Sequence, residues 1–294
     1  MRLGRGSASP SGQDPTLQAA RLAPEMDLRV SSPFLALPSF DLRAPHACGC
    51  FMNLSRFRHR VSFLILVTAA FLWAGVPYAH VPFEWFETLF HESSHALMAW
   101  VTGGQVSRIE LHLDGSGLTW TAGGMGALVS FAGYAGAVFW GAALYGLATA
   151  VSARAARTVV LGLLVLGAWE TLAWLAFSPG SWLIMGTMMA ILALLLWKPA
   201  AGLARQALRF IGLYVLLSGI RSPTFQLAQG VAHSDAMDLR AVTWVPASVW
   251  VGLWVTLGAL TLAALYWREH RADHATGSDT LSPTRTTVGT KSSA

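Results

Sequence analysis

Long apolar segments separated by short polar connections fill most of the chain between residues 61 and 267. Inside a bilayer the backbone has no water to bond, so spanning segments are helices or closed barrels, and a spanning helix needs about 20 apolar residues. Seven segments approach this length: 61–80, 84–101, 123–149, 158–177, 181–197, a shorter 206–220, and 243–267. We therefore expect an all-α polytopic membrane protein with six or seven transmembrane helices.

Composition favours this fold class over a soluble or nucleic-acid-binding protein. Of the 294 residues, 54% are hydrophobic and 12% are charged, whereas soluble domains carry about 25% charged residues. The net charge is +5, but the basic residues are dispersed around the apolar segments and form no basic face. We expect the lipid bilayer as a partner and no nucleic acid. Cys48 and Cys50 lack the second cysteine pair that a structural zinc site needs, so we interpret them as incidental thiols.

The two ends of the chain differ in composition from its middle. Residues 1–55 are rich in Pro, Ser and Arg and contain no sustained apolar run, which is typical of a disordered basic extension. The segment after Met52 is short and basic and leads into the first apolar run, so we hypothesise that residues 1–51 come from an over-called translation start. Residues 268–294 are polar and rich in Ser and Thr, and we expect them to be disordered. The membrane-embedded domain is then expected to span 56–267.

A metal-binding pattern lies inside the second apolar segment. Residues 91–95 read His91-Glu92-Ser93-Ser94-His95, an H-E-x-x-H motif. Positions i and i+4 of a helix share a face, so both imidazoles can reach one Zn²⁺ ion while Glu92 lies beside the remaining coordination position. A carboxylate in that place can act as the general base that takes a proton from water. Such polar groups are costly in hydrocarbon, so we expect them to face the protein interior or a water-filled cavity.

A zinc hydrolase usually has three protein ligands, so a third ligand must come from elsewhere in the chain. The position that carries the third histidine in soluble H-E-x-x-H-x-x-G-x-x-H enzymes is Val101, which cannot bind the ion. A downstream glutamate would have to be Glu110, in a predicted hairpin, or Glu170, in an apolar run. For Glu170, an ion pair with an arginine such as Arg221 is the more conservative interpretation. Better candidates lie just before the last apolar segment: His233, Asp235 and Asp238.

Residues 104–121 differ in kind from the apolar segments. Apolar and polar side chains alternate on both sides of the turn at 114–117, which predicts a β-hairpin. A hairpin beside a metal site offers an edge to which an extended peptide can add as a strand. The other interpretation is a solvent-exposed connection, and the sequence does not decide between the two.

The segment 123–149 is rich in glycine and alanine. Gly133, Ala137 and Gly141 follow one another at four-residue spacing, and small residues at this spacing let helix backbones approach closely. We interpret the spacing as ordinary helix packing and expect this helix to pack against the motif helix.

The distribution of arginines does not assign an orientation from the sequence alone. Cytoplasmic connections are enriched in Lys and Arg, so Arg56, Arg58 and Arg60 place the N-terminus in the cytoplasm. If every apolar segment crosses the membrane, the same count places two basic groups outside, against the rule: Arg154 with Arg157, and Lys198 with Arg205 and Arg209. A re-entrant segment, or a segment that does not cross, would change this parity.

Further motifs accompany the H-E-x-x-H pattern in order: Ala96-Leu97, Thr102-Gly103-Gly104, the Gly115-Ser116-Gly117 turn, Ala132-Gly133-Tyr134-x-Gly136, His233-Ser234-Asp235-Ala236, and Thr243-x-x-Pro246-x-x-x-Trp250. Together they resemble the bacterial M50B-type branch of the site-2 proteases over roughly residues 60–265. The resemblance implies an intramembrane zinc metalloprotease whose third ligand is a sequence-distant Asp, and Asp235 is the residue that matches. The L-D-G motif around this Asp in better-known members is absent here, so Asp238 is the second choice as a ligand, and His233 can support the site.

From the resemblance we expect a multi-pass protein of a bacterial inner membrane that hydrolyses peptide bonds of membrane-embedded protein substrates. The segment 56–267 is then the metalloprotease domain, with Zn²⁺ held by His91, His95 and Asp235 and with Glu92 as the catalytic base. The alternative is a non-catalytic site-2-protease-like membrane protein that binds a metal or a partner without cleavage. The presence of Glu92 favours catalysis, because a site that only binds a metal needs no base.

Overall fold

The computed structural model describes residues 58–197 and 201–279, which belong to one compact unit, Phe51–Ala294. Within these ranges the elements follow in this order: α1 (Arg58–Trp73), α2 (Val81–Val101), β1 (Gln105–Leu111), β2 (Gly117–Ala122), α3 (Gly126–Ala150), α4 (Ala155–Ala173), α5 (Pro179–Trp197), α6 (Ala201–Gln229), α7 (Asp235–Thr243) and α8 (Ala247–Asp279). The expected helical class, with a hairpin after the motif helix, is confirmed. The predictions for residues 1–55, for the two cysteines and for 280–294 lie outside the described residues.

Five of the described helices are long and apolar enough to cross a membrane: α3, α4, α5, α6 and α8. The described part of α1 has 16 residues, which is short for a span. The motif helix α2 has 21 residues but carries Glu84, Glu87 and Glu92. The five apolar helices make this an integral multi-pass membrane protein. The expected count of six or seven spans included α1 and α2, and neither of them is among these five.

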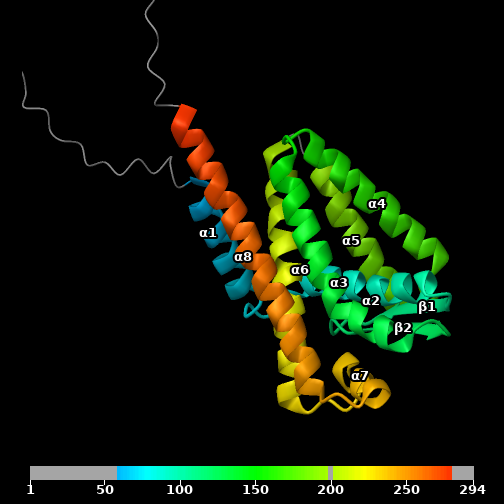
Figure 1. Cartoon of the computed structure of the whole chain (residues 1–294). Helices are drawn as coiled ribbons and strands as arrows, with labels where there is room; N and C mark the ends of the chain where they lie inside the picture. Colours follow the sequence, from blue (N-terminus) through cyan, green and yellow to red (C-terminus); the bar gives the residue numbers. More distant parts are fainter. Residues whose placement is uncertain (1–57, 198–200, 280–294) are drawn as a thin grey trace, which may run out of the picture. The chain divides into compact units, whose positions relative to one another are not determined.

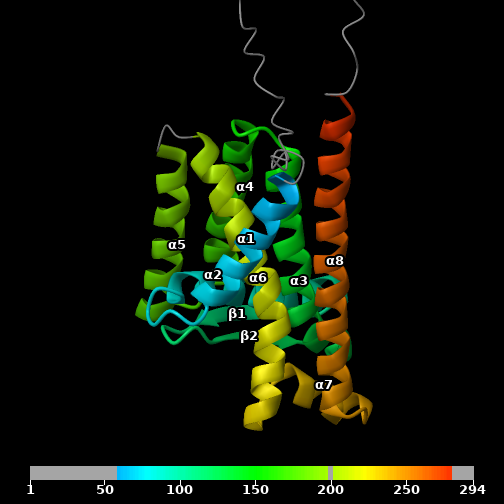
Figure 2. The ribbon, with the colours of Figure 1, turned by 90° about the vertical axis from the view of Figure 1, so that its left-hand side faces the viewer.

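The motif helix lies across the other long helices rather than along them (Figures 1 and 2). The hairpin lies beside α2, and α7 lies farther out at the same end of the bundle (Figures 1 and 2). β1 and β2 pair antiparallel from Gln105↔Ala122 to Leu111↔Gly117. On the outer edge of β1, the N–H of Ile109 donates to the carbonyl of Trp174, and its carbonyl accepts from Ala176 N–H, at 2.6 and 2.8 Å. The connection between α4 and α5 therefore fixes the hairpin beside the motif helix.

Glycines on α3 allow this helix to pack closely on two sides. A Cβ added to Gly136 would overlap the side chain of Ser94 on α2, so the expected packing of α3 against the motif helix is confirmed. On the other side, a Cβ on Gly141 would lie 2.5 Å from the carbonyl oxygen of Gly212 on α6. Small residues thus bring three helix backbones together, as they do in membrane helix bundles generally.

The last helix extends beyond the expected end of the membrane domain at residue 267. α8 continues to Asp279, so the disorder predicted from 268 onward is wrong for its first part. The reason is tertiary: the carboxylate of Asp273 accepts hydrogen bonds from the backbone N–H groups of His59 and Arg60 at 2.9 and 3.1 Å. Both N–H groups belong to the first described turn of α1, and side-chain acceptors commonly bond to the backbone N–H groups of a first helical turn. Polarity alone therefore gave the wrong boundary, because this polar segment caps another helix.

Candidate functional site

His91 and His95 lie one turn apart on α2, and their Nε2 atoms are 3.0 Å apart. Nδ1 of His95 lies 2.6 Å from the carbonyl oxygen of Val129 on α3. A carbonyl can only accept, so Nδ1 carries the proton and the lone pair of Nε2 is free to bind a metal. The ring of His91 packs edge-on against Tyr134, also on α3, with centroids 4.5 Å apart. α3 thus orients both imidazoles of the motif.

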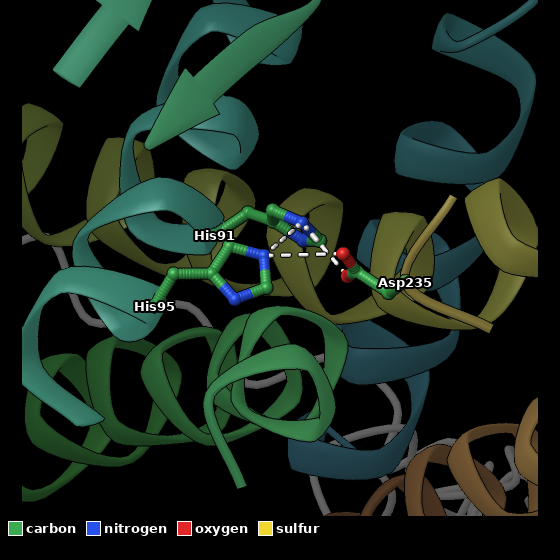
Figure 3. A group of neighbouring side chains, drawn as sticks. All are labelled: His91, His95 and Asp235. Atoms are coloured by element: carbon green, nitrogen blue, oxygen red, sulfur yellow. Dashed lines mark hydrogen bonds and ion pairs between the residues drawn. The ribbon is translucent and has the colours of Figure 1, made fainter. Parts of the chain in front are cut away.

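Asp235 joins the two histidines from the first residue of α7 (Figure 3). Its Oδ2 lies 3.2 Å from Nε2 of His91, and its Oδ1 lies 3.4 Å from Nε2 of His95. Ser234 is extended, so the chain turns into the helix immediately before the carboxylate. One ligand atom from each of the three residues lies within 4.8 Å of the others. Two nitrogen donors and one carboxylate oxygen therefore converge from distant parts of the chain.

These three residues fit a Zn²⁺ ion. Oδ2 of Asp235 is buried and makes no hydrogen bond, although Nε2 of His91 is close by. Atoms that converge without hydrogen-bond geometry suit a shared cation, and a donor set of two histidines and one carboxylate is common in catalytic zinc sites. A Cβ added to Gly133 on α3 would lie 2.5 Å from Nε2 of His95 and 2.6 Å from Nε2 of His91. Only glycine at this position leaves space beside both nitrogen donors.

The electrostatics keep Asp235 in the form that binds metals. Burial by itself raises the pKa of Asp235, but the adjacent imidazoles of His95 and His91 lower it, and the resulting pKa lies below the ordinary value. The carboxyl group is therefore ionised at neutral pH, as a metal ligand must be.

Glu92 is held by the second strand of the hairpin. Its side chain is 6% exposed, and the hydroxyl of Thr119 on β2 donates to its Oε2 at 2.7 Å. Gly117 opens the same strand, and a Cβ added there would lie 2.9 Å from Oε1 of Glu92. The hairpin therefore contacts the carboxylate of Glu92 through the hydroxyl of Thr119 and the backbone of Gly117, and these contacts position it.

A cavity of about 830 Å³ contains all of these groups. Its walls come from α2, the turn and β2 of the hairpin, α3, the end of α6, and α7. His91, Glu92, His95 and Asp235 all line it. A space of this size beside a carboxylate base and a convergent donor set can hold a segment of peptide.

A comparison with protein-family models identifies the chain. The model described as Peptidase M50B-like matches residues 63–265. The chain belongs to the M50B-like peptidase family. The resemblance inferred from the sequence motifs is thereby confirmed, and the H-E-x-x-H motif and Asp235 both lie within the matched range. No curated protein and no solved structure matched the chain.

The other candidate ligands of this M50B-like peptidase lie apart from the three donors. Asp238 and His233 are exposed and line the cavity, but neither belongs to the convergent group. Glu110 lies on β1 and pairs with Arg108 at 2.6 Å. The structure therefore brings Asp235, and not Asp238, beside the histidines.

Glu170 and Arg221 do not form the ion pair expected from the sequence. Glu170 is buried on α4, whereas Arg221 on α6 lies 3.4 Å from Glu84 of the motif helix. The prediction failed because pairing partners within a bundle depend on which helix faces turn toward each other. Both Glu84 and Arg221 line the cavity, so this ion pair forms part of its wall.

Sequence reasoning missed three residues that shape the site. Thr119 bonds the carboxylate of Glu92, Tyr134 packs on His91, and Gly133 makes room for the two imidazoles. A partial signal existed for Thr119, because the alternation along the hairpin places it on one face together with Thr121. Gly133 and Tyr134 belong to the Ala132-Gly133-Tyr134-x-Gly136 motif noted in the sequence, but that motif assigned no role in the site to either residue.

Proposed function

We propose that this M50B-like peptidase is a zinc metalloprotease that hydrolyses peptide bonds of membrane-embedded protein substrates. The observation that carries the proposal is the placement of Glu92 in the same cavity as the three converging donor atoms of His91, His95 and Asp235. A site that only stored a metal would need no carboxylate held free beside it. Membership in a peptidase family and the five apolar helices support the same conclusion.

Each polar group of the site has a role in this mechanism. His91, His95 and Asp235 would hold Zn²⁺, which when bound lowers the pKa of a water molecule to about 7 and polarises a carbonyl group. Glu92 accepts a proton from the attacking water and delivers it to the departing amine. Thr119 fixes the carboxylate of Glu92 through the bond to Oε2, which leaves Oε1 to exchange the proton.

A substrate has to enter this cavity in extended form. A transmembrane helix hides its carbonyls in internal hydrogen bonds, so the substrate must unwind locally before cleavage. The outer edge of β1 is partly used by Trp174 and Ala176, whereas β2 pairs only with β1 among the described residues. β2 also lines the cavity with residues 117–119 and Thr121. We therefore propose that the substrate adds as a strand to the edge of β2, beside Glu92.

The membrane that houses the protein follows from the resemblance. The motif set resembles that of bacterial M50B proteases, so we propose that the protein lies in the inner membrane of a bacterium. The non-catalytic alternative leaves the contact of Thr119 with Glu92 without a purpose, because a binding protein needs no oriented base.

Replacement of Glu92 tests the proposal. Glu92→Gln keeps the size of the side chain and removes the base, and the matched control is Glu110→Gln on the outer face of the hairpin. We expect both purified variants to retain wild-type zinc content, measured by atomic absorption. New peptide termini in the membrane proteome, measured by mass spectrometry, should disappear with Glu92→Gln and persist with Glu110→Gln. Membrane-protein termini that are identical in wild type and Glu92→Gln would refute the protease function.

A further inference from the structure

A groove of about 500 Å³ lies along one face of α1 and shares no residue with the cavity that contains the site. Five residues of α1 and one of α6 line it: Arg58, Val61, Ser62, Ile65, Leu66 and Gln206. The five on α1 have the spacing of a single helix face, and this face extends for about 12 Å along the helix. Val61 and Ile65 are 41% and 61% exposed, so the groove opens on the outer surface of the helices.

The groove combines an apolar face with polar groups near the start of α1 and α6. The two helices begin at the same end of the bundle (Figures 1 and 2). Arg58 is the first residue of α1, and Gln206 lies near the start of α6. Val61, Ile65 and Leu66 supply the apolar part of the groove. In an integral membrane protein, an exposed apolar face suits contact with an acyl chain, and donors at its start suit a headgroup.

The amide of Gln206 has a fixed orientation. Nη1 of Arg209, one turn later on α6, donates to Oε1 of Gln206 at 3.1 Å. A guanidinium group can only donate, so the amide turns its oxygen toward Arg209, and its NH₂ group is left to donate to another partner. Arg209 is 6% exposed and donates to the hydroxyl of Tyr145 at 3.1 Å, which in turn donates to Glu269 at 3.2 Å. A buried chain of hydrogen bonds therefore holds Gln206 as a donor.

The six residues that line the groove include one basic residue, Arg58, and no acidic residue. The next two residues of α1 face carboxylates of α8: His59 lies 3.7 Å from Glu269, and Arg60 lies 3.1 Å from Asp273. Within residues 58–197 and 201–279, no carboxylate forms an ion pair with Arg58. The charge of the groove therefore suits an anion, whereas a cationic headgroup such as choline finds no carboxylate along it.

We propose that this groove binds an anionic phospholipid, with the phosphate between Arg58 and Gln206 and an acyl chain along the apolar face of α1. Basic pockets between membrane helices bind anionic headgroups in the same way. The apolar part of the groove favours a lipid over a free anion, and its positive charge favours an anionic over a zwitterionic headgroup. Because the lipid contacts both α1 and α6, its binding stabilises the packing of these helices. The proposal does not depend on the proposed protease function.

Native mass spectrometry of the delipidated full chain in detergent tests the proposal, and the melting temperature is a second readout. Palmitoyl-oleoyl phosphatidylglycerol is compared with phosphatidylcholine that carries the same chains, and with inorganic phosphate. We expect the wild type to bind one phosphatidylglycerol about fivefold more tightly than phosphatidylcholine, the factor expected for one arginine that acts on an anionic lipid. Phosphatidylglycerol should raise the melting temperature, whereas inorganic phosphate should not.

Two variants test the polar part of the groove. Arg58→Gln removes the charge, and Gln206→Glu removes the NH₂ donor while it keeps an oxygen that can accept from Arg209. Each should weaken the binding of phosphatidylglycerol by about 10-fold or more, the factor that loss of one hydrogen bond to a charged group produces. The matched control is Arg154→Gln, which removes an exposed arginine at the start of α4, outside the groove. Its affinity for phosphatidylglycerol should stay at the wild-type value.

A third variant tests the apolar part. Ile65→Trp fills the groove and should abolish the binding of phosphatidylglycerol, whereas Leu64→Trp, at a position that is 50% exposed on α1 and outside the groove, should not. Equal affinity for the two lipids, an equal loss in Arg58→Gln and Arg154→Gln, or wild-type affinity in Ile65→Trp would overturn the proposal. An equal rise in melting temperature with inorganic phosphate would assign the donors to a free anion and would overturn it as well.

Discussion

Replacement of Gly133 by alanine tests how closely α3 packs against the metal-binding residues. The added Cβ would lie 2.5 Å from Nε2 of His95 and 2.6 Å from Nε2 of His91, about 1 Å closer than an ordinary contact of about 3.5 Å. Overpacking of this kind costs about 1–3 kcal/mol. Zinc sites tolerate ligand displacements of only about 0.2 Å, so the strain falls on the metal-bound state. We expect the zinc affinity of Gly133→Ala to fall by about 10- to 100-fold, the factor that such a cost produces.

The assay is competition for zinc with a chromophoric chelator, on purified protein in detergent micelles. Gly126→Ala is the matched control on the same helix, since a Cβ there meets no atom within 4 Å. Substitution with Co²⁺ adds a second readout, because its visible spectrum reports the coordination geometry and should change only in Gly133→Ala. A folded Gly133→Ala protein with wild-type zinc affinity and an unchanged cobalt spectrum would refute the close packing of α3 on the two histidines.

Three further predictions follow from individual contacts. In chelator competition, Asp235→Ala should lower the zinc affinity by about 100-fold or more, whereas Asp238→Ala should leave it unchanged. A loss of zinc affinity in Asp238→Ala, with none in Asp235→Ala, would assign the third ligand to Asp238. Thr119→Val should slow proteolysis by about 10- to 100-fold at constant zinc content, because one hydrogen bond to a charged group is worth about 1.5–3 kcal/mol. An unchanged rate of peptide release would show that Thr119 has no part in the mechanism. Asp273→Asn should lower the melting temperature in detergent by about 2–6 °C through weaker capping of α1, while the zinc affinity stays constant as a control. An unaltered melting temperature would contradict the capping role of Asp273.

The helical class and the hairpin were predictable because both depend on local patterns. Long apolar runs must form helices in lipid, and alternation around a turn at 114–117 favours a hairpin wherever the segment is placed. The position of His91 and His95 on one face follows from helical geometry alone. The family, too, could be inferred from spaced motifs, and the match over residues 63–265 agrees with that inference.

Other features depend on contacts between distant segments, which local pattern does not contain. The end of α8 was misplaced because the polar residue Asp273 caps the start of α1. The partner of Arg221 was wrong because the facing helix presents Glu84. The transverse course of α2 could not be inferred either, since its length and its apolar flanks suit a spanning helix as well.

The sequence by itself determined that this chain builds membrane helices and a paired-histidine motif with an adjacent carboxylate, because periodicity and hydropathy act within a single segment. The tertiary structure decided which of two carboxylates, three residues apart at the start of α7, lies beside the imidazoles. It also decided that β2 holds Glu92 through the hydroxyl of Thr119. These outcomes depend on how α2, α3 and α7 pack against one another. The free energy of such packing is shared among many residues, so no short segment of the sequence specifies it.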